Sequence, residues 1–164
     1  MQKNSLSIIL ASVVTLIIIG GVYFAFFRKD NNPITGLPAG WHHETTDHFA
    51  LDLPDGWKLK KQQGIDSYVG EITHRETKLT YDFGMYSNSL ERDGSTSMAL
   101  NHNISYEMIH GKEARVVTPH QIGSGTTGVH FGNIDGKNTL TITGQDLSGD
   151  DQETALQIFR SITF

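Results

Sequence analysis

Histidine and acidic side chains gather in one short stretch, the densest group in the chain that could do chemistry. It contains His42, His43, Glu44, Asp47 and His48. Imidazole is a common ligand of zinc, copper and nickel, so the stretch suggests a metal site built from His42 or His43 together with His48. Adjacent strand residues point to opposite faces, so His42 and His43 would share one ion only if this segment were irregular. We assign no metal ligand here; the alternative is histidines that are exposed or hydrogen-bonded.

A glycine-rich run at 123–128 reads GSGTTG and matches the G-x-G-x-x-G pattern of dinucleotide-binding loops. Such a loop needs a strand before it and a helix after it, because the pyrophosphate lies on the helix N-terminus. Residues 129–134 instead alternate as a strand does, so we expect no nucleotide binding. Gly123-Ser124-Gly125 is also not the nucleophile elbow of a hydrolase, which has the pattern G-x-S-x-G.

The remaining acidic candidates have structural explanations. Asp150 and Asp151 precede an amphipathic run and are better explained as the start of a helix. Asp82 lies on the outer face of its strand, between Tyr81 and Phe83, where it is either a surface polar residue or a contact for a partner. The chain has no cysteine, which excludes disulfides, thiolate metal sites and cysteine nucleophiles. The sequence therefore indicates no catalytic residue and no cofactor.

The soluble part of the chain is acidic. All 18 acidic residues follow position 29, whereas Lys3, Arg28 and Lys29 precede them. The part after position 29 is therefore more negative than the net charge of −5 of the whole chain, and it should repel nucleic acid and anionic lipid surfaces. Its only basic cluster is the lysine group at 58–61, which is too small to bind nucleic acid.

The elements that would position any site begin with a membrane segment. The run from Asn4 to Phe27 carries no charge, and as a helix it reaches about 36 Å, enough to cross a hydrocarbon core of about 30 Å. A cleaved signal peptide needs a shorter apolar stretch and small residues at its end, whereas this run ends in Phe26 and Phe27. We therefore expect an uncleaved signal anchor over residues 1–29, with the lipid bilayer as its partner.

The charges that flank this single-pass anchor nearly balance, so they do not decide its orientation. Lys3 and the amino terminus stand on one side, and Arg28 and Lys29, offset by Asp30, stand on the other. The short N-terminal tail favours placing the rest of the chain outside the cytoplasm, in the periplasm or the extracellular space. Residues 30–40 (DNNPITGLPAG) predict a tether to one soluble domain over 41–164.

The soluble domain is predicted to consist mainly of β-hairpins. Alternating apolar residues predict four antiparallel pairs: 48–53 with 57–61 through Pro54-Asp55-Gly56, 67–74 with 78–85, 104–109 with 113–118 through His110-Gly111, and 129–134 with 138–143 through Asp135-Gly136. The segment from Ser87 to Asn103 lacks a sustained period and is expected to be a long loop.

Only the end of the chain is predicted to be helical. Ala155, Ile158, Phe159 and Ile162 recur at the spacing of one buried helix face. The fold class is therefore α+β, an antiparallel sheet built from hairpins with a C-terminal amphipathic helix packed on it, preceded by the transmembrane helix.

The chain also resembles a known group of domains. The resemblance rests on FALDLPDGWKLKKQQGIDSYVGEI, with its turn at Pro54, Gly56 and Trp57, on KLTYDFG after it, and on the ending ALQIFRSITF. These features are similar to the PsbP/Mog1/DcrB-like α/β domains, among which small anchored bacterial proteins of unknown function recur. Members serve as accessory subunits and as partners of other proteins. The resemblance implies this fold and an adapter-like role, with the domain in the bacterial envelope.

Two functions remain open. The first is a noncatalytic, membrane-tethered accessory or protein-binding domain of the bacterial cell envelope, with an envelope protein as its partner. The alternative is an envelope enzyme or metal-binding protein that uses the histidine and acidic residues. An accessory domain should expose a patch of apolar or aromatic side chains, whereas an enzyme should bring His, Asp or Glu together in a cleft.

Overall fold

The computed structural model describes residues 37–62, 64–91 and 101–164. These residues belong to one compact unit, Leu37–Phe164. The expected signal anchor at 1–29 and most of the expected tether at 30–40 lie outside the described residues. Among the residues that are described, no helix has the length and apolar character that crossing a membrane requires.

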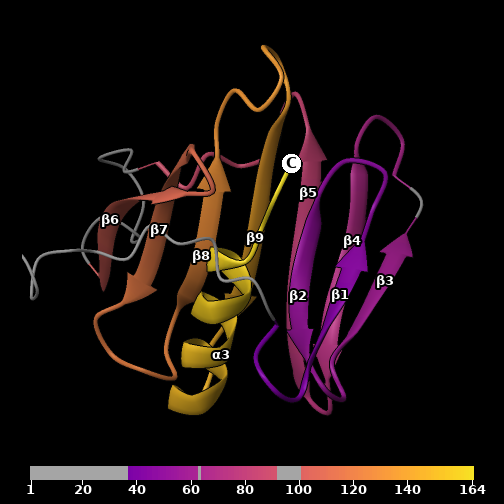
Figure 1. Cartoon of the computed structure of the whole chain (residues 1–164). Helices are drawn as coiled ribbons and strands as arrows, with labels where there is room; N and C mark the ends of the chain where they lie inside the picture. The colour runs from indigo at the N-terminus through magenta and orange to yellow at the C-terminus, as the bar shows by residue number, and fades with distance from the viewer. Residues whose placement is uncertain (1–36, 63, 92–100) are drawn as a thin grey trace, which may run out of the picture. The chain divides into compact units, whose positions relative to one another are not determined.

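The described domain is an antiparallel α+β fold, as the sequence predicts. Seven strands form one sheet in the order β3-β4-β5-β9-β8-β7-β6, and β1 pairs with β2 in a separate two-stranded sheet (Figure 1). The strands are β1 (Trp41–Thr45), β2 (Ala50–Pro54), β3 (Lys58–Gln62), β4 (Tyr68–His74), β5 (Thr77–Gly84), β6 (His102–Ile109), β7 (Lys112–Pro119), β8 (Thr126–Phe131) and β9 (Thr139–Gln145), and the helix is α3 (Gly149–Arg160).

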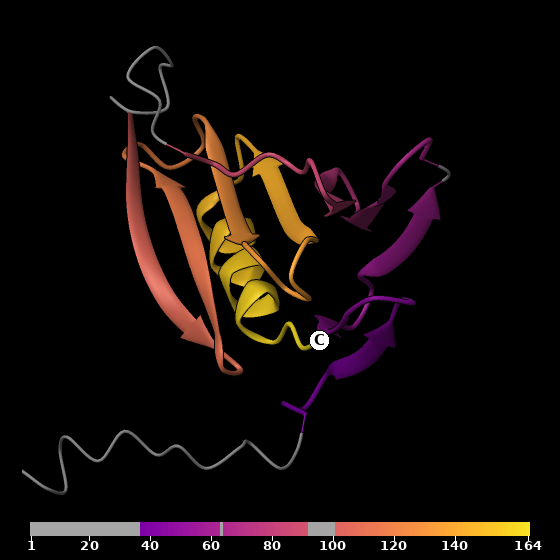
Figure 2. The ribbon, with the colours of Figure 1, turned by 90° about the horizontal axis from the view of Figure 1, so that it is seen from above.

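The core lies between one face of the seven-stranded sheet and a layer made of α3 and the β1–β2 pair (Figure 2). In β5, Leu79, Tyr81 and Phe83 point into this core and are at most 4% exposed, because side chains alternate along a strand. The covering layer contributes Leu51 and Leu53 from β2 and Ala155, Ile158 and Phe159 from α3. At the edge of the sheet, β3 carries three exposed lysines, Lys58, Lys60 and Lys61.

The predicted C-terminal helix α3 is present, with Asp150 and Asp151 in its first turn, but its N-cap is Ser148 and it ends at Arg160. The Ser148 side chain is the N-cap and accepts a hydrogen bond from the backbone N–H of Asp151, while Asp150 and Asp151 place negative charge in the first turn. Arg160, in the last turn, donates from Nε and Nη2 to the Glu107 carboxylate on β6, at 2.9 and 3.0 Å. This two-point contact fixes the end of the helix to the outermost strand of the sheet.

The residues after α3 return to β2. Ala50 and Thr163 exchange two backbone hydrogen bonds of 2.9 Å each, and Ile162 is completely buried. The prediction that Ile162 is buried is confirmed, but Ile162 lies beyond the end of α3 and not on the helix face where the sequence pattern placed it.

Two predicted hairpins are confirmed. Strands β4 and β5 pair through the turn at Arg75-Glu76, where Arg75 has a φ of 52°. Strands β6 and β7 pair through His110-Gly111, with φ values of 44° and 81°. Positive φ at both central residues is the signature of a type I′ turn, whose twist matches that of the flanking strands.

The predicted pairing of 48–53 with 57–61 is wrong. Strand β2 pairs with β1, for which the sequence predicts no strand, and β3 pairs with β4. The Pro54–Gly56 turn therefore carries the chain from one sheet to the other. Apolar alternation reports which face of a strand is buried, but not which strand lies beside it.

The predicted pairing of 129–134 with 138–143 is confirmed by β8 and β9, but the turn between them at Asp135-Gly136 differs from the prediction. Strand β8 ends at Phe131 and β9 begins at Thr139, so a loop replaces the predicted tight hairpin turn. Gly136 has a φ of 95°, whereas Asp135 has no positive φ and instead accepts backbone hydrogen bonds from Lys137 and Asn138 through its side chain. The Asp-Gly pair is thus an Asx-type turn within a longer loop.

Candidate functional site

The two adjacent histidines of the metal hypothesis lie on β1 and have different partners. His42 Nε2 is 3.5 Å from Glu44, and its Nδ1 is 3.9 Å from Asp55. His43 Nδ1 is 2.7 Å from a carboxylate oxygen of Asp52, the residue opposite it on β2. The strand therefore places the two imidazoles on opposite faces, as its geometry requires.

The third histidine, His48, lies in the turn after β1 and packs among aromatic rings. Its ring stacks on Phe83 with a centroid distance of 4.5 Å and an interplanar angle of 8°, and it lies 3.9 Å from the ring of Tyr68. No described residue forms a hydrogen bond with its buried Nε2. Among the described residues, no three His, Asp or Glu side chains are grouped as a metal site requires.

The glycine-rich run forms the turn that leads into strand β8. Gly123 and Gly125 have φ values of 82° and 110°, and β8 begins directly afterwards at Thr126. A Cβ on Gly125 would lie 2.7 Å from His102 Nε2, which accepts the backbone hydrogen bond of Thr126 at 2.9 Å. The prediction that a strand rather than a helix follows these glycines is confirmed, and Gly125 is the closely packed position of the turn.

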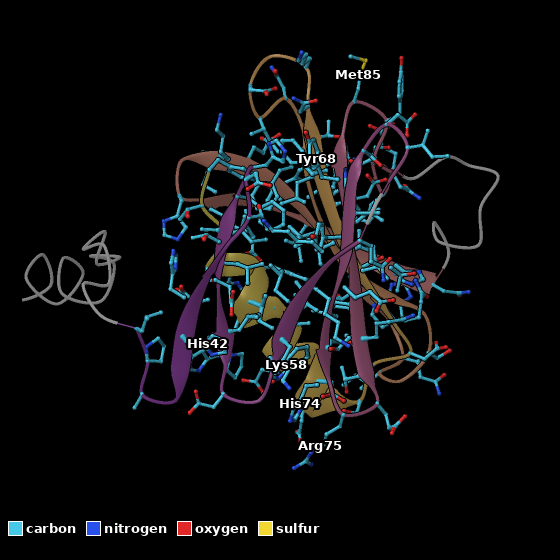
Figure 3. All side chains as sticks on the ribbon, turned by 90° about the vertical axis from the view of Figure 1, so that its right-hand side faces the viewer. His42, Lys58, Tyr68, His74, Arg75 and Met85 are labelled. Carbon is cyan, nitrogen blue, oxygen red and sulfur yellow. The ribbon has the colours of Figure 1, made fainter. Side chains whose placement is uncertain are left out.

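Four large apolar side chains are exposed together at one end of the sheet. Tyr68, Met85 and Tyr86 are 57%, 51% and 85% exposed, and Ile65 is fully exposed. Because β4 and β5 are antiparallel, the start of β4 lies beside the end of β5, and the loop before β4 contacts Gly84 (Figure 3). We call Ile65, Tyr68, Met85 and Tyr86 the aromatic end.

The chain enters the described domain at the opposite end of the sheet. Trp41 pairs with Pro54, and the ring of Trp57 stacks on His74, which precedes the β4–β5 turn. Figure 3 shows His42, His74 and Arg75 at this end and Tyr68 and Met85 at the other. The length of β4 separates the two ends by about 20 Å.

The sheet face opposite α3 is polar and is partly covered by residues 85–91, which cross it after β5 (Figure 2). On this open face Val69, Asp82, Thr141, His130 and Arg115 stand in register across five neighbouring strands. Leu90, in the crossing segment, is 2% exposed and lies against Gly128, where a Cβ would approach its Cδ1 to 2.9 Å. The crossing segment is therefore anchored on β8 by one buried side chain.

A hydrogen-bond network ties this crossing segment to the sheet. Thr141 Oγ1 donates to the backbone carbonyl of Asn88 at 2.5 Å, and His130 Nδ1 lies 2.9 Å from the same hydroxyl. Since the Thr141 proton goes to Asn88, the Thr141 hydroxyl oxygen is left to accept a hydrogen bond from His130 Nδ1. Burial, with Arg115 beside it as the next cause, lowers the pKa of His130 below 6.5. Arg115 itself donates to the carbonyl of Ser89.

A cavity of about 330 Å³ opens between this segment and strands β3, β4, β5, β8 and β9. Hydroxyl and amide side chains dominate its lining, which includes Thr80, Thr143, Gln145 and Asn88. Among the described residues of the lining, Asp82 alone is charged, and none of them donates a hydrogen bond to the buried Oδ1 atom of its carboxylate. The arrangement can accept hydrogen bonds from a bound molecule but holds no described nucleophile–base pair.

Sequence patterns reveal these surfaces only in part. The alternation in β5 identifies Asp82 as an outward-facing residue, but the cavity around it depends on a segment that crosses the sheet later in the chain. Tyr68 shares its face of β4 with the buried Ile72, so the alternation does not reveal that Tyr68 is exposed. No known protein family matches the chain, and no curated protein is similar to it.

Proposed function

We propose that this protein is a noncatalytic accessory domain of the bacterial cell envelope, tethered to the membrane, that binds another protein through the aromatic end. The observation that carries the proposal is the exposure of Ile65, Tyr68, Met85 and Tyr86 at the same end of the sheet. Large apolar side chains that gather on one part of the surface are costly to leave in water and mark contact surfaces.

The composition of the aromatic end supports a protein as the partner. Tyrosine and methionine are enriched in protein interfaces, because tyrosine combines a large apolar ring with a hydroxyl that can stay hydrogen-bonded. The ring of Tyr68 is also held in place, because it contacts the rings of both His48 and Phe83. A side chain held in place in this way loses little conformational freedom when a partner binds.

The alternative, an envelope enzyme or metal-binding protein, receives no comparable support. The imidazoles of His42 and His43 are directed at different carboxylates, and His48 lies in an aromatic stack. An adapter role also agrees with the resemblance to PsbP/Mog1/DcrB-like domains.

The membrane location rests on the uncharged run from Asn4 to Phe27. A periplasmic or extracellular position of the domain is part of the proposal. A reporter enzyme fused after Phe164 tests it directly. Activity of a reporter that works only outside the cytoplasm supports the proposal, and activity of one that works only in the cytoplasm contradicts it.

Site-specific crosslinking tests the binding surface. A photoreactive benzophenone amino acid is placed at position 86 of the full chain in its native membrane, and the matched control carries it at position 76, in the exposed turn at the other end of β4 and β5. We expect a discrete crosslinked protein at position 86, absent at position 76 and lost when Tyr68→Ser and Met85→Ser are combined. Equal products at both positions, or products insensitive to these substitutions, would contradict the proposal.

A further inference from the structure

The cavity on the open sheet face contains a buried acceptor that the described protein does not satisfy. The Oδ1 atom of Asp82 is shielded from solvent, and no described residue donates a hydrogen bond to it. A buried carboxylate oxygen without a donor costs free energy, so such groups in proteins usually have a partner. Oδ1 is shielded from the cavity as well, so a molecule in the cavity would meet Asp82, the one charged residue of its described lining, through the other carboxylate oxygen, Oδ2.

The hydroxyl groups near Asp82 differ in whether they can bind a ligand. Thr141 stands opposite Asp82 on β9, but its single proton goes to the carbonyl of Asn88 at 2.5 Å. The hydroxyl oxygens of Thr80 and Thr143 are 3.3 Å apart, which is a long distance for a hydrogen bond between hydroxyl groups. Their hydroxyls are therefore available to a ligand, whereas Thr141 cannot donate to Asp82.

The charge of Asp82 is also uncompensated within the described residues. Lys78 lies on the same strand and face, but its ammonium group is 3.3 Å from Glu71. Arg115, further across the open face, is 3.3 Å from Glu91. No described lysine, arginine or histidine forms an ion pair with Asp82, so a cation is the ligand group that its carboxylate would bind best.

We propose that this cavity binds a small primary amine that also carries hydroxyl groups, with the dimensions of a single amino sugar, and that its ammonium group contacts Asp82. The hydroxyls of the ligand would meet the pair Thr80 and Thr143, and its carbon atoms would lie against Val69 and Leu90, which are apolar residues of the lining. A volume of about 330 Å³ accommodates one such ring.

A metal ion fits the cavity less well than an amine. Metal sites in proteins combine several carboxylate, imidazole or thiolate ligands, and the described residues of the cavity lining offer a single carboxylate. An anionic ligand is disfavoured by the same carboxylate. None of the four residues of the aromatic end lines the cavity, so this proposal stands independently of the protein-binding function.

Calorimetric titration of the full chain in detergent micelles tests the proposal. The probes are D-glucosamine, N-acetyl-D-glucosamine, in which the amine is acylated and uncharged, and D-glucose. We expect D-glucosamine to bind with a dissociation constant on the order of 1 mM, because a ligand of this size makes few contacts. The two uncharged sugars should bind at least tenfold more weakly, since they lack the charged hydrogen bond.

Three variants localise the binding. Asp82→Asn keeps the shape of the side chain, removes its charge and should weaken D-glucosamine binding at least tenfold. Thr143→Val should weaken it severalfold, which a nonspecific attraction to an acidic domain would not explain. Glu76→Gln removes one exposed negative charge at the end of the sheet, and we expect it to bind as the parent does.

The proposal is overturned if D-glucosamine does not bind, if all three sugars bind equally, or if Asp82→Asn and Glu76→Gln have the same effect. Circular dichroism and urea unfolding of each variant establish that the compared proteins are folded. Asp82→Asn replaces an unpaired carboxylate by an amide of equal size, so we expect it to fold at least as stably as the parent.

Discussion

His130 Nδ1 lies 2.9 Å from the hydroxyl oxygen of Thr141, in a position where the imidazole is buried. Burial and the nearby Arg115 lower its pKa in the folded state, whereas the unfolded chain keeps a value of about 6.5. The unfolded chain therefore takes up a proton first as the pH falls. Stability from this residue is present above pH 6.5 and is lost progressively as the pH drops from there toward the folded pKa.

The corresponding measurement is urea unfolding of the parent protein and of His130→Gln between pH 7.5 and pH 5. We expect the parent to lose more stability than the variant over this range. The difference between the two proteins removes the contribution of the other histidines. Parallel pH dependence of the two would show that His130 is not the responsible group.

Leu90→Ala should detach the segment that crosses the open sheet face. Leu90 is 2% exposed and packs against Gly128, so truncation should cost about 2–5 kcal/mol of the free energy of unfolding or release the segment locally. Limited proteolysis within residues 85–91 distinguishes local release from global destabilisation. Leu37→Ala, at a position 46% exposed, is the matched control and should change stability by no more than about 0.5 kcal/mol.

Removing the ion pair between Arg160 and Glu107 should loosen β6. The contact has two hydrogen bonds but is partly exposed, so Arg160→Gln should cost only about 0.5–1 kcal/mol. Hydrogen exchange of the backbone amides of β6 should nevertheless accelerate, because α3 no longer holds that strand. Unchanged exchange in β6 would contradict the expectation that the contact with Arg160 holds this strand.

Gly111→Ala tests the type I′ turn between β6 and β7. Gly111 has a φ of 81° and no atom within 4 Å of an added Cβ, so the cost of the substitution is purely conformational. We expect a loss of about 1–2 kcal/mol. Gly132→Ala serves as the control, because Gly132 has no positive φ and an added Cβ would meet its nearest atom at 3.6 Å. Equal effects of the two substitutions would argue against backbone strain.

The metal hypothesis for His42, His43 and His48 predicts stoichiometric binding of Zn²⁺ or Cu²⁺. Because His42 and His43 point to opposite faces of β1 and His48 is stacked on Phe83, we expect only weak, nonspecific binding in a calorimetric titration. A one-to-one complex that is lost in His48→Gln would restore the alternative function. His110→Gln, in an exposed turn, controls for nonspecific histidine effects.

Local sequence patterns predict the elements of this fold better than their pairing. The alternation of Leu79, Tyr81 and Phe83 identifies the buried face of β5, and His110-Gly111 identifies a tight turn, because both depend only on neighbouring residues. The partner of β2 cannot be read in this way. Strand β1 (WHHET) has almost no apolar alternation, so the sequence pattern does not reveal that it pairs with β2.

The two candidate surfaces depend on contacts between distant parts of the chain. The aromatic end exists because antiparallel pairing brings the start of β4 beside the end of β5. The cavity exists because Leu90 packs on Gly128 and carries the segment across the sheet. Neither contact leaves a periodic signal, so the sequence indicates only that Asp82 faces outward.

The three lysines on β3 acquire a role from their position at the edge of the sheet. An outermost strand offers unpaired backbone groups to which a second copy of the same strand can add, and this is a common route to aggregation. Stacking one β3 on another would bring Lys58, Lys60 and Lys61 against the same charges in the neighbouring chain, which disfavours the pairing. The lysine cluster is too small to attract a polyanion, but it disfavours association of two domains through their β3 strands.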